Sequence, residues 1–266
     1  MNVRGSAARF TLLITMTAHP AYVWCQDEEP KLNQPTRPGT MRSAEIQRHG
    51  VLQLDLGGNV RVNASEFRNE QSLPLTIRYS FLDSLVVETQ VEPFISEQKD
   101  IDGLRRTGVG DTVVGAQWLA ANEERRRPSV AAAYYVKVPT APSSKELGTG
   151  RVDHHLVLLL SKKFGETDAD INVAYLNTGR EQGDRVSGMM AGVSLSREFQ
   201  SHFGFVGELS ELTQDMDVPH GAYALGAVTY RLTERMRLDG GTRVGLTHDA
   251  ARFSVIGGIS VSVPVH

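Results

Sequence analysis

The feature that most constrains the fold of this chain is a strict alternation of apolar and polar residues, which is clearest over residues 235–246. Successive side chains of a β-strand point to opposite faces, so the alternation predicts a strand with one apolar face. The apolar face would carry Met236, Leu238, Val244 and Leu246, and the other face would carry Arg235, Arg237, Asp239 and Arg243. Four charges on one face exclude a strand that is buried on both sides.

The same period recurs from residue 49 to the end of the chain. Twelve stretches show it: residues 52–56, 75–81, 85–92, 114–120, 130–138, 156–160, 171–175, 189–195, 203–209, 223–230, 235–246 and 253–263. Residues 156–160 are apolar on both faces, and residues 223–230 hold too much alanine and glycine for a face to be assigned. A single stretch is a weak signal. Each stretch is close to the length of about 9–11 residues that a tilted membrane strand needs, and their repetition predicts a barrel wall.

The linkers between these stretches alternate in length. Residues 82–83 and 232–234 are short, whereas residues 57–72, 97–110, 139–153, 177–185 and 211–221 are long and polar. Short periplasmic turns and long outer loops are typical of outer-membrane barrels. Residues 121–128, which are charged and not short, and the brief residues 247–251 depart from the pattern. The sequence therefore predicts an all-β fold, a transmembrane up-and-down antiparallel β-barrel of about 12 strands, with a soluble periplasmic sandwich as the alternative.

Composition fits this prediction. The mean hydropathy is only −0.25, because lipid-facing and lumen-facing residues average out in a barrel wall. The net charge of −3 and the lack of a basic face exclude a nucleic-acid partner. Aromatic residues near the strand ends are candidates for girdles at the two membrane interfaces: Tyr79, Phe81, Trp118, Tyr134, Tyr175, Phe203, Tyr230 and Phe253.

The N-terminus has the pattern of an export signal. Arg4 and Arg9 precede an apolar run, residues 10–18, that is too short to span a bilayer. Cleavage after Cys25 or after Ala21 fits the pattern, and cleavage after Cys25 would leave no cysteine in the mature chain. We therefore expect a signal peptide over residues 1–25, an extended periplasmic leader over residues 26–44, and a barrel over residues 45–266.

The polar faces of the stretches predict which side chains line the lumen. The candidates are Asp55, Arg78, Glu88, Glu92, Lys137, Glu208, Arg237, Asp239 and Arg243. Acids and bases are about equal in number, whereas an ion-selective pore would carry one sign of charge. The lumen is therefore expected either to pair its charges into a plug-like network or to form a wet path with little charge preference. Twelve strands leave a lumen of modest width.

Four segments, residues 107–118, 136–153, 160–165 and 172–179, together resemble the meta-pathway of phenol degradation family of outer-membrane barrel proteins. The motif residues in the first two segments are Gly108, Gly110, Asp111, Pro139, Thr140, Gly148, Gly150 and Asp153. The resemblance implies a barrel that passes small aromatic or hydrophobic molecules, and this solute class comes from the family label alone. Ala141 stands where the family often has glycine, and the chain ends on His266 instead of the aromatic residue that helps the insertion machinery.

The sequence offers no convincing catalytic or metal-binding arrangement. His154 and His155 are adjacent, so on a strand they point to opposite faces and cannot hold one metal ion together. Gly148-Thr149-Gly150 lacks the lysine of a phosphate-binding loop. No motif marks a serine–histidine pair, although serines are frequent. We therefore expect no enzyme, no cofactor and no metal site.

The sequence thus favours an exported protein of the bacterial outer membrane that allows passive passage of small solutes, narrowed by residues 139–153 and other outer loops. Its expected partners are membrane lipid and lipopolysaccharide, the barrel-insertion machinery and a small-molecule solute. A closed structural or adhesive barrel is the main alternative, and a barrel enzyme acting on lipids is a third possibility. The identity of the solute and whether the lumen is open stay undetermined at this stage.

Overall fold

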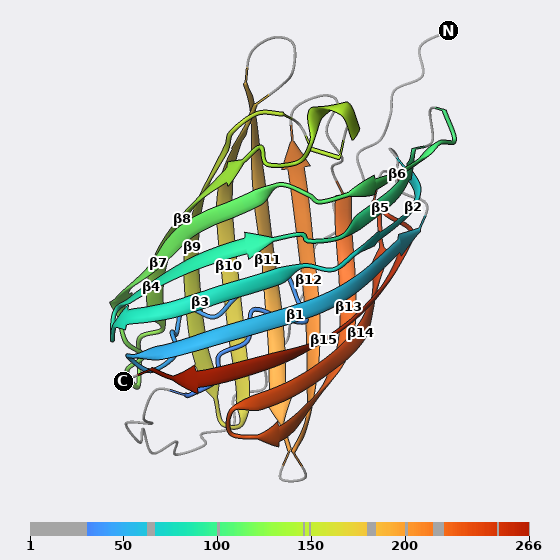
Figure 1. The fold of residues 1–266 in the computed structure, drawn as a ribbon. Helices are drawn as coiled ribbons and strands as arrows, with labels where there is room; N and C mark the ends of the chain where they lie inside the picture. The colour runs from blue at the N-terminus through green and yellow to red at the C-terminus, as the bar shows by residue number, and fades with distance from the viewer. Residues whose placement is uncertain are drawn as a thin grey trace, which may run out of the picture.

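A single antiparallel sheet closes on itself into a barrel in the computed structural model of this chain (Figure 1). The structure describes residues 31–62, 67–99, 102–145, 147–148, 150–179, 185–199, 202–214, 221–248 and 250–265. The first strand, β1 (Val51–Val62), pairs with the last, β15 (Phe253–Pro264), over its whole length. This pairing satisfies the two edges that an open sheet would leave exposed, which a sheet in lipid requires.

The wall between these two strands is built from thirteen further segments. They are β2 (Phe67–Ser72), β3 (Leu75–Leu82), β4 (Leu85–Val91), β5 (Ile95–Lys99), β6 (Arg105–Gly108), β7 (Thr112–Ala121), β8 (Ser129–Val138), β9 (Asp153–Phe164), β10 (Thr167–Thr178), β11 (Val186–Glu198), β12 (Phe203–Gln214), β13 (Gly221–Thr233) and β14 (Met236–Gly245). The helical turn η1 (Ser143–Lys145) follows β8. Among the described residues, no helix has the length and apolarity needed to cross a membrane.

Three of the barrel strands are each made of two segments in line. β1 pairs with β3 through residues 52–56 and with β2 through residues 59–62, so β2 and β3 together form one neighbour of β1. β4 and β5 form the next strand, and β6 and β7 the one after it. Fifteen segments therefore make twelve barrel strands, which confirms the predicted fold class and strand number.

The breaks within these strands are aligned across the wall. They fall at residues 73–74, 92–94 and 109–111, and the first two contain a proline, which cannot donate to a strand ladder. The breaks stay bonded to one another. The backbone N–H of Leu73 donates to the carbonyl oxygen of Phe94 (2.9 Å), and that of Gly110 donates to Glu92 (2.8 Å).

The expectation of long loops over residues 57–72 and 97–110 was wrong. β1 continues to Val62, and β2, β5 and β6 occupy much of the remainder. These extensions escaped the alternation rule because β2 and β6 carry polar side chains on both faces, so no apolar period marks them. The wall is therefore taller beside β1 than the apolar pattern indicates.

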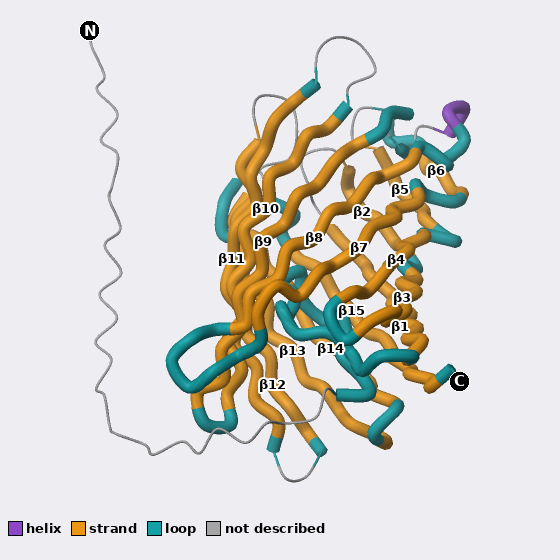
Figure 2. The backbone as a smooth tube through the Cα atoms, turned by 90° about the vertical axis from the view of Figure 1, so that its left-hand side faces the viewer, coloured by secondary structure: helices purple, strands orange, loops and turns teal. Residues whose placement is uncertain are grey.

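The two ends of the barrel differ (Figure 2). At the short-turn end, residues 83–84, 165–166 and 234–235 connect strands through two-residue turns, and Gly165 takes the positive φ of 64° that such turns favour. The charged residues 122–128 fold back on β9 at this end, where Glu123 pairs with Lys162 (2.7 Å). The opposite, long-loop end carries residues 139–152 and 246–252. This arrangement confirms the short turns predicted near residues 82–83 and 232–234 and the long connection predicted over residues 139–153, whereas residues 122–128 and 246–252 are the predicted departures from the length pattern.

The barrel carries its apolar side chains outside and its polar ones inside. Leu56, Leu158 and Leu209 are about half exposed on the outer face, whereas Gln53, Asp55 and Gln117 are fully buried inside. Of the aromatic girdle candidates, Phe81, Trp118, Phe203 and Tyr230 stand outside near the short-turn end, and Tyr134, Tyr175 and Phe253 near the long-loop end. Tyr79 packs edge-on against Phe81, with ring centroids 4.7 Å apart.

Residues 31–50, which we call the lumenal loop, lie inside the barrel (Figure 1). The loop begins at the short-turn end, where the Asn33 side chain donates to the carbonyl oxygen of Arg235 (3.2 Å). It reaches mid-height at Met41, whose backbone N–H donates to Glu208 (2.9 Å). It then returns to the short-turn end, where Ser80 Oγ donates to the carbonyl of Gln47 (3.0 Å), and β1 begins.

The expected position of the leader was therefore wrong from Lys31 onward. The segment is extended, as predicted, but it packs within the lumen instead of lying free in the periplasm, and Ala44 and Gln47 are fully buried. Its prolines and polar residues carry no period that could mark a packed element. The predicted signal peptide and residues 26–30 lie outside the described residues, so the signal peptide stays a prediction.

The outward apolar belt gives a first test. Leu158→Arg places a charge at the middle of β9 on the outer face and should lower the free energy of unfolding in phospholipid by about 2–4 kcal/mol. Phe164→Arg, at the end of the same strand, is the matched control and should cost about 0–1 kcal/mol. Denaturant titration in lipid vesicles measures both values, and equal costs would contradict a belt that lies in hydrocarbon.

Candidate functional site: the lumen and its loop

The first part of the lumenal loop is bound through its backbone to β1. The Gln53 side-chain amide makes two bonds with Gln34, accepting from its N–H (2.8 Å) and donating to its carbonyl oxygen (2.9 Å). Two residues further along, the backbone N–H and hydroxyl of Thr36 both donate to the Asp55 carboxylate, at 3.0 and 2.8 Å. Gln53 and Asp55 are both buried away from water, so the loop supplies the hydrogen-bond partners that their polar groups need.

At mid-height the loop crosses to the opposite wall. The backbone N–H groups of Thr40 and Met41 donate to one oxygen of Glu208, at 2.7 and 2.9 Å. Asn172 makes a second two-bond clamp, accepting from the N–H of Arg42 (2.7 Å) and donating to its carbonyl (2.8 Å). The wall therefore recognises mainly the backbone of the loop, which any sequence with suitable geometry would present.

Two wall glycines leave room for the loop. A Cβ atom at Gly192 would lie 2.7 Å from the sulfur of Met41, and one at Gly258 would lie 2.5 Å from Nε of Arg37. Side-chain atoms do not approach that closely, so a larger residue at either position would force the loop to move. The glycines of the wall thus help to make the lumen wide enough for a second layer of chain.

The returning part of the loop packs on a small apolar patch. Ala44 contacts a cluster formed by Ala131, Ala133, Tyr135 and Leu159 on β8 and β9. Its backbone N–H donates to Ser161 Oγ (2.7 Å), and its carbonyl oxygen accepts from Gln117 (3.0 Å). This patch explains why residues 156–160 are apolar on both faces: one face meets the outside, and the other covers the loop.

Charged groups fix the loop more specifically. Arg42 donates to both oxygens of Glu88 (2.7 Å) and to the Tyr135 hydroxyl (3.0 Å), and Arg78 lies 3.2 Å from the same carboxylate. Burial lowers the pKa of the Arg42 guanidinium, but the charge and hydrogen bond of Glu88, together with Tyr135 and Asp55, raise that pKa by more, so the net shift is upward. Arg37 pairs with Asp239 (3.2 Å) and donates to the carbonyl oxygen of Gly257 (2.8 Å).

All nine side chains predicted to line the lumen are buried or half-buried on inward-facing positions. Six of them hold the lumenal loop: Asp55, Arg78, Glu88, Glu208, Asp239 and Arg243. Arg237 instead pairs with Glu198 at the short-turn end (2.8 Å). The charge-based prediction missed the uncharged clamps Gln53, Gln117 and Asn172, although their positions in the alternation already placed them on the inner face.

The motif residues meet at the long-loop end. Lys137 pairs with both Asp111 (3.6 Å) and Asp153. Asp111 accepts the N–H of Ala141 (3.0 Å), and Asp153 accepts that of Gly179 (2.8 Å). The Thr140 hydroxyl hydrogen-bonds the carbonyl oxygen of Gly110 and the hydroxyl of Thr112. Gly148 lies against the Asp111 carboxylate, and Gly108 lies against Lys145. Gly150 has a φ of 64°, and the half-buried Pro139 follows the end of β8. Glu92, predicted to line the lumen, lies against Gly110.

The histidine pair separates as the strand period requires. His154 lies on the outer face, where its Nδ1 is 2.7 Å from the Tyr134 hydroxyl, and His155 is on the inner face. Within the described ranges, no group of three or more histidine, cysteine or acidic side chains could hold a metal ion.

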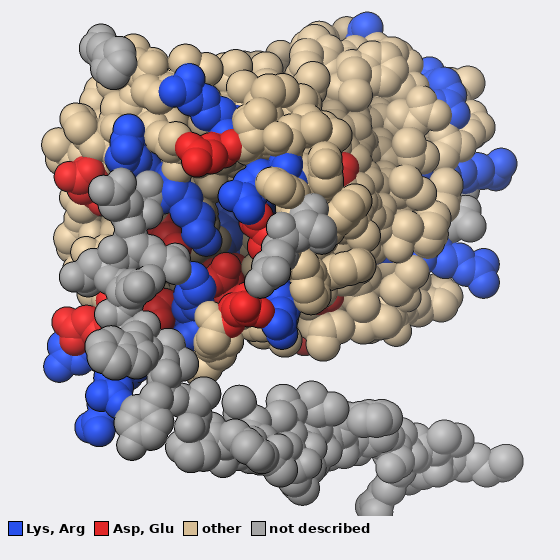
Figure 3. All heavy atoms as spheres, turned by 90° about the horizontal axis from the view of Figure 1, so that it is seen from below, with Lys and Arg blue, Asp and Glu red and all other residues tan. Residues whose placement is uncertain are grey.

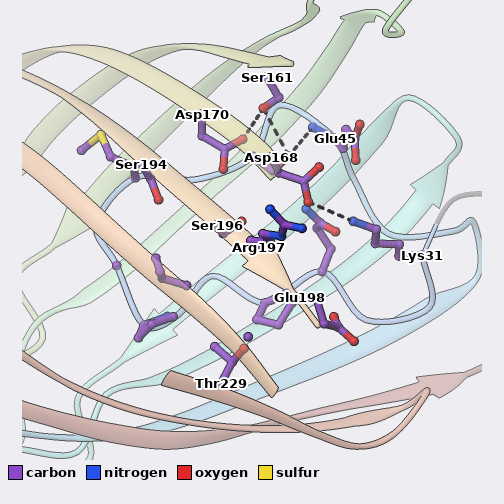
Figure 4. Close-up of a pocket in the computed structure, with 18 of the residues that line it drawn as sticks. Lys31, Glu45, Ser161, Asp168, Asp170, Ser194, Ser196, Arg197, Glu198 and Thr229 are labelled. Atoms are coloured by element: carbon purple, nitrogen blue, oxygen red, sulfur yellow. Dashed lines mark hydrogen bonds and ion pairs between the residues drawn. The ribbon is translucent and has the colours of Figure 1, made fainter. Parts of the chain in front are cut away.

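The lumenal loop does not fill its end of the barrel. A cavity of about 120 Å³ lies between the loop and strands β9 to β14 (Figure 4). Asp168, Asp170 and Ser194 line it from the wall, and Lys31 and Glu45 line it from the loop. Burial raises the pKa of the Glu45 carboxyl against the opposing charge of Lys31, and the charge of Asp168 raises it further. Charged side chains gather around the mouth of the barrel at this end (Figure 3).

Comparison with known proteins shows which family this chain belongs to. The profile of the family described as "Putative MetA-pathway of phenol degradation" matches residues 36–263. The chain belongs to this family. The match includes residues 36–50, which are most of the lumenal loop. No curated protein matches the sequence.

A solved outer-membrane channel structure shows the same fold, and two other barrel structures are less similar. The COG4313 outer membrane channel from Pseudomonas putida F1 superposes with a TM-score of 0.65 at 14% identity, covering 85% of this chain and 99% of that chain. The CymD monoaromatic hydrocarbon channel gives 0.45 at 9% identity, with 82% and 90% covered. The anion-selective porin from Comamonas acidovorans gives 0.39 at 9% identity, with 80% and 98% covered.

The buried charges that hold the loop predict a strong and specific stability effect. Glu88→Ala leaves Arg42 and Arg78 without their shared carboxylate and should lower the free energy of unfolding by about 3–5 kcal/mol. Removal of the whole set in Arg42→Met/Arg78→Met/Glu88→Leu should cost clearly less, because no unpaired buried charge of the set remains. Denaturant titration of the unmodified chain and the two variants measures this, and a triple variant that costs as much as Glu88→Ala would contradict a coupled set.

Proposed function

We propose that this protein is an outer-membrane channel for passive passage of small solutes, and that the lumenal loop is its constriction. The observation that carries the proposal is that the wall does not fill the barrel with its own side chains. A separate segment of chain occupies the lumen at mid-height and is attached mainly by hydrogen bonds and ion pairs. Barrels of about eight strands are filled by side chains of the wall, whereas this wider barrel leaves room for the loop and for a cavity beside it.

The outer surface supports a location in the outer membrane. Its apolar belt lies between aromatic residues at the two ends, such as Trp118 near the short-turn end and Tyr134 near the long-loop end. Both the lumenal loop and the C-terminal strand end at the short-turn end, as an even strand count requires. We therefore place the short-turn end in the periplasm and the long-loop end outside, with lipid and lipopolysaccharide around the belt and insertion machinery acting during assembly.

The solute class remains part of the proposal. The description of the family names phenol degradation, and a protein that shares the fold is an outer membrane channel. Small aromatic or hydrophobic molecules are therefore the first solutes to test. No catalytic step is proposed, and among the described residues no group of three or more histidine, cysteine or acidic side chains could hold a metal ion.

One observation favours the alternative of a closed barrel without transport. The inward charges meet one another and the loop, as in the buried set of Arg42, Arg78 and Glu88, and do not form a continuous row of free charge. If the loop never moves, this network would close the lumen permanently. The two proposals therefore differ in one property, which is whether displacement of the loop changes the flux.

A reversible lock tests this property. The backbone of Ala44 bonds Ser161 Oγ, so Ala44→Cys with Ser161→Cys, made in a Cys25→Ser background, should crosslink the loop to β9 on oxidation. The oxidised protein should show lower single-channel conductance and slower liposome swelling than the same protein after reduction. The Cys25→Ser parent, treated with the same oxidant and reductant, is the control and should not respond.

A loosened loop should act in the opposite direction. Glu208→Ala removes the carboxylate that binds the N–H groups of Thr40 and Met41, so conductance should rise severalfold above that of the unmodified chain. Asp83→Asn, a change of the same charge in an exposed turn, should leave conductance unaltered. Absence of flux in both the reduced lock variant and Glu208→Ala would support the closed barrel and refute the channel.

A further inference from the structure

Three arginines stand together in the turn between β7 and β8, at the short-turn end of the barrel. Arg125, Arg126 and Arg127 are all exposed, and within the described parts of the chain none of their guanidinium groups takes part in a hydrogen bond, ion pair or ring contact. Arginines of the wall such as Arg61 and Arg78 instead meet carboxylates. Like charges on adjacent residues repel one another, so the grouping of these three arginines does not stabilise the chain itself.

The backbone of this turn is held in one conformation. Glu124 and Arg127 form an isolated β-bridge, with N–H to oxygen bonds of 3.0 and 3.1 Å in the two directions. Lys162 of β9 donates to the carbonyl oxygens of Glu124 (2.6 Å) and Arg127 (3.4 Å). The Glu123 carboxylate accepts from Lys162 (2.7 Å) and from the backbone N–H of Lys163 (3.0 Å). The turn is therefore ordered before it meets a partner, which lowers the entropic cost of binding.

The bonds to β9 place the turn on the lipid-facing side of the barrel rim. Lys162 lies between Leu160 and Phe164 in the outward-facing set of β9 positions, which also includes the half-exposed Leu158. Phe164 and Trp118, both more than half exposed on the outer face, mark the edge of the apolar belt at this end. The three arginines therefore stand close to the level at which lipid headgroups begin.

We propose that the β7–β8 turn binds the phosphate groups of anionic phospholipids in the periplasmic leaflet of the outer membrane. A guanidinium group donates two parallel hydrogen bonds to a phosphate, and a basic segment is attracted to an anionic lipid surface. Because Lys162 neutralises Glu123, only Glu124 among residues 122–128 opposes the three arginines. The turn therefore carries a net positive charge.

The position of the turn favours lipid over a soluble partner. An acidic periplasmic protein could bind equally well to a turn that pointed away from the membrane, whereas this turn is bonded to the lipid-facing Lys162. The proposal rests on the proposed location in the outer membrane and on its orientation, with the short-turn end in the periplasm. It does not rest on transport.

Trp118 provides a reporter of the lipid beside the turn. It lies on the outer face of β7, and the other tryptophan of the chain, Trp24, falls in the predicted signal peptide. The mature chain is reconstituted into mixed vesicles of phosphatidylcholine and phosphatidylglycerol, with brominated acyl chains on one lipid or the other. The ratio of the two quenching efficiencies gives the relative affinity. Phosphatidylglycerol should be preferred by about fivefold or more, as expected for an arginine near an anionic surface, and about 1 M salt should reduce this preference.

Variants identify the groups responsible. The triple variant Arg125→Gln/Arg126→Gln/Arg127→Gln should bring the affinity ratio close to one, and Arg126→Gln alone should lower it partway. Glu124→Gln removes the opposing acid and should raise the ratio. The matched control is Arg252→Gln, which removes an exposed arginine at the long-loop end and should leave the ratio unaltered, because the reporter lies at the short-turn end.

The outcomes that overturn the site are equally specific. A folded triple variant that keeps the full preference would show that lipid charge is recognised elsewhere. Equal quenching by the two brominated lipids in the unmodified chain would also refute the proposal and leave the turn to an acidic periplasmic protein. If the triple variant does not fold, Arg126→Gln decides the question, and an unaltered ratio refutes the site. Failure of the unmodified chain to insert into the vesicles would instead refute the membrane location on which the proposal rests.

Discussion

The structure depends on one requirement, which is that every polar group removed from water must find a partner inside the protein. Closure of β1 against β15 meets this requirement for the backbone of the wall. The same closure turns half of the side chains inward, and many of these are polar or charged. A twelve-stranded wall is too wide for its inward side chains to satisfy one another across the lumen. The lumenal loop supplies the missing partners, so the plug and the wall are two consequences of one constraint.

The backbone clamps follow from that constraint. Gln53 and Asn172 each use a side-chain amide to bond both the N–H and the carbonyl oxygen of one loop residue. A neutral amide that is fully paired costs little to bury and holds an extended chain without strong dependence on its sequence. The ion pair of Arg42 with Glu88 fixes where the loop lies on the wall, because a buried charge tolerates only one arrangement of its partners. Backbone clamps therefore hold the loop, and the ion pairs set its register.

The period-two alternation was sufficient to predict the barrel, its strand number and, except for residues 156–160 and 223–230, which faces point inward. Residues 235–246 show why: four charges on one face and four apolar residues on the other leave only one kind of wall. The lumenal loop could not be predicted, because Pro35, Pro38 and Gly39 carry no period and many of the loop's contacts are made by its backbone. β2 and β6 were missed for a related reason, since strands that are polar on both faces lack the contrast on which the prediction rests.

The same reasoning explains why the candidate site was only half visible in the sequence. Alternation assigned Glu88 and Asp239 to the lumen, but their partners Arg42 and Arg37 lie in a segment expected to be outside it. The loop contacts strands around much of the barrel and leaves small side chains, such as Ser194 and Ser196, facing the cavity. Where loop and wall touch, Gln53, Asn172 and Glu88 find partners within the chain. Asp170 and Glu45 line the cavity instead and are only half-buried, so water can reach them there and the loop does not have to satisfy every oxygen.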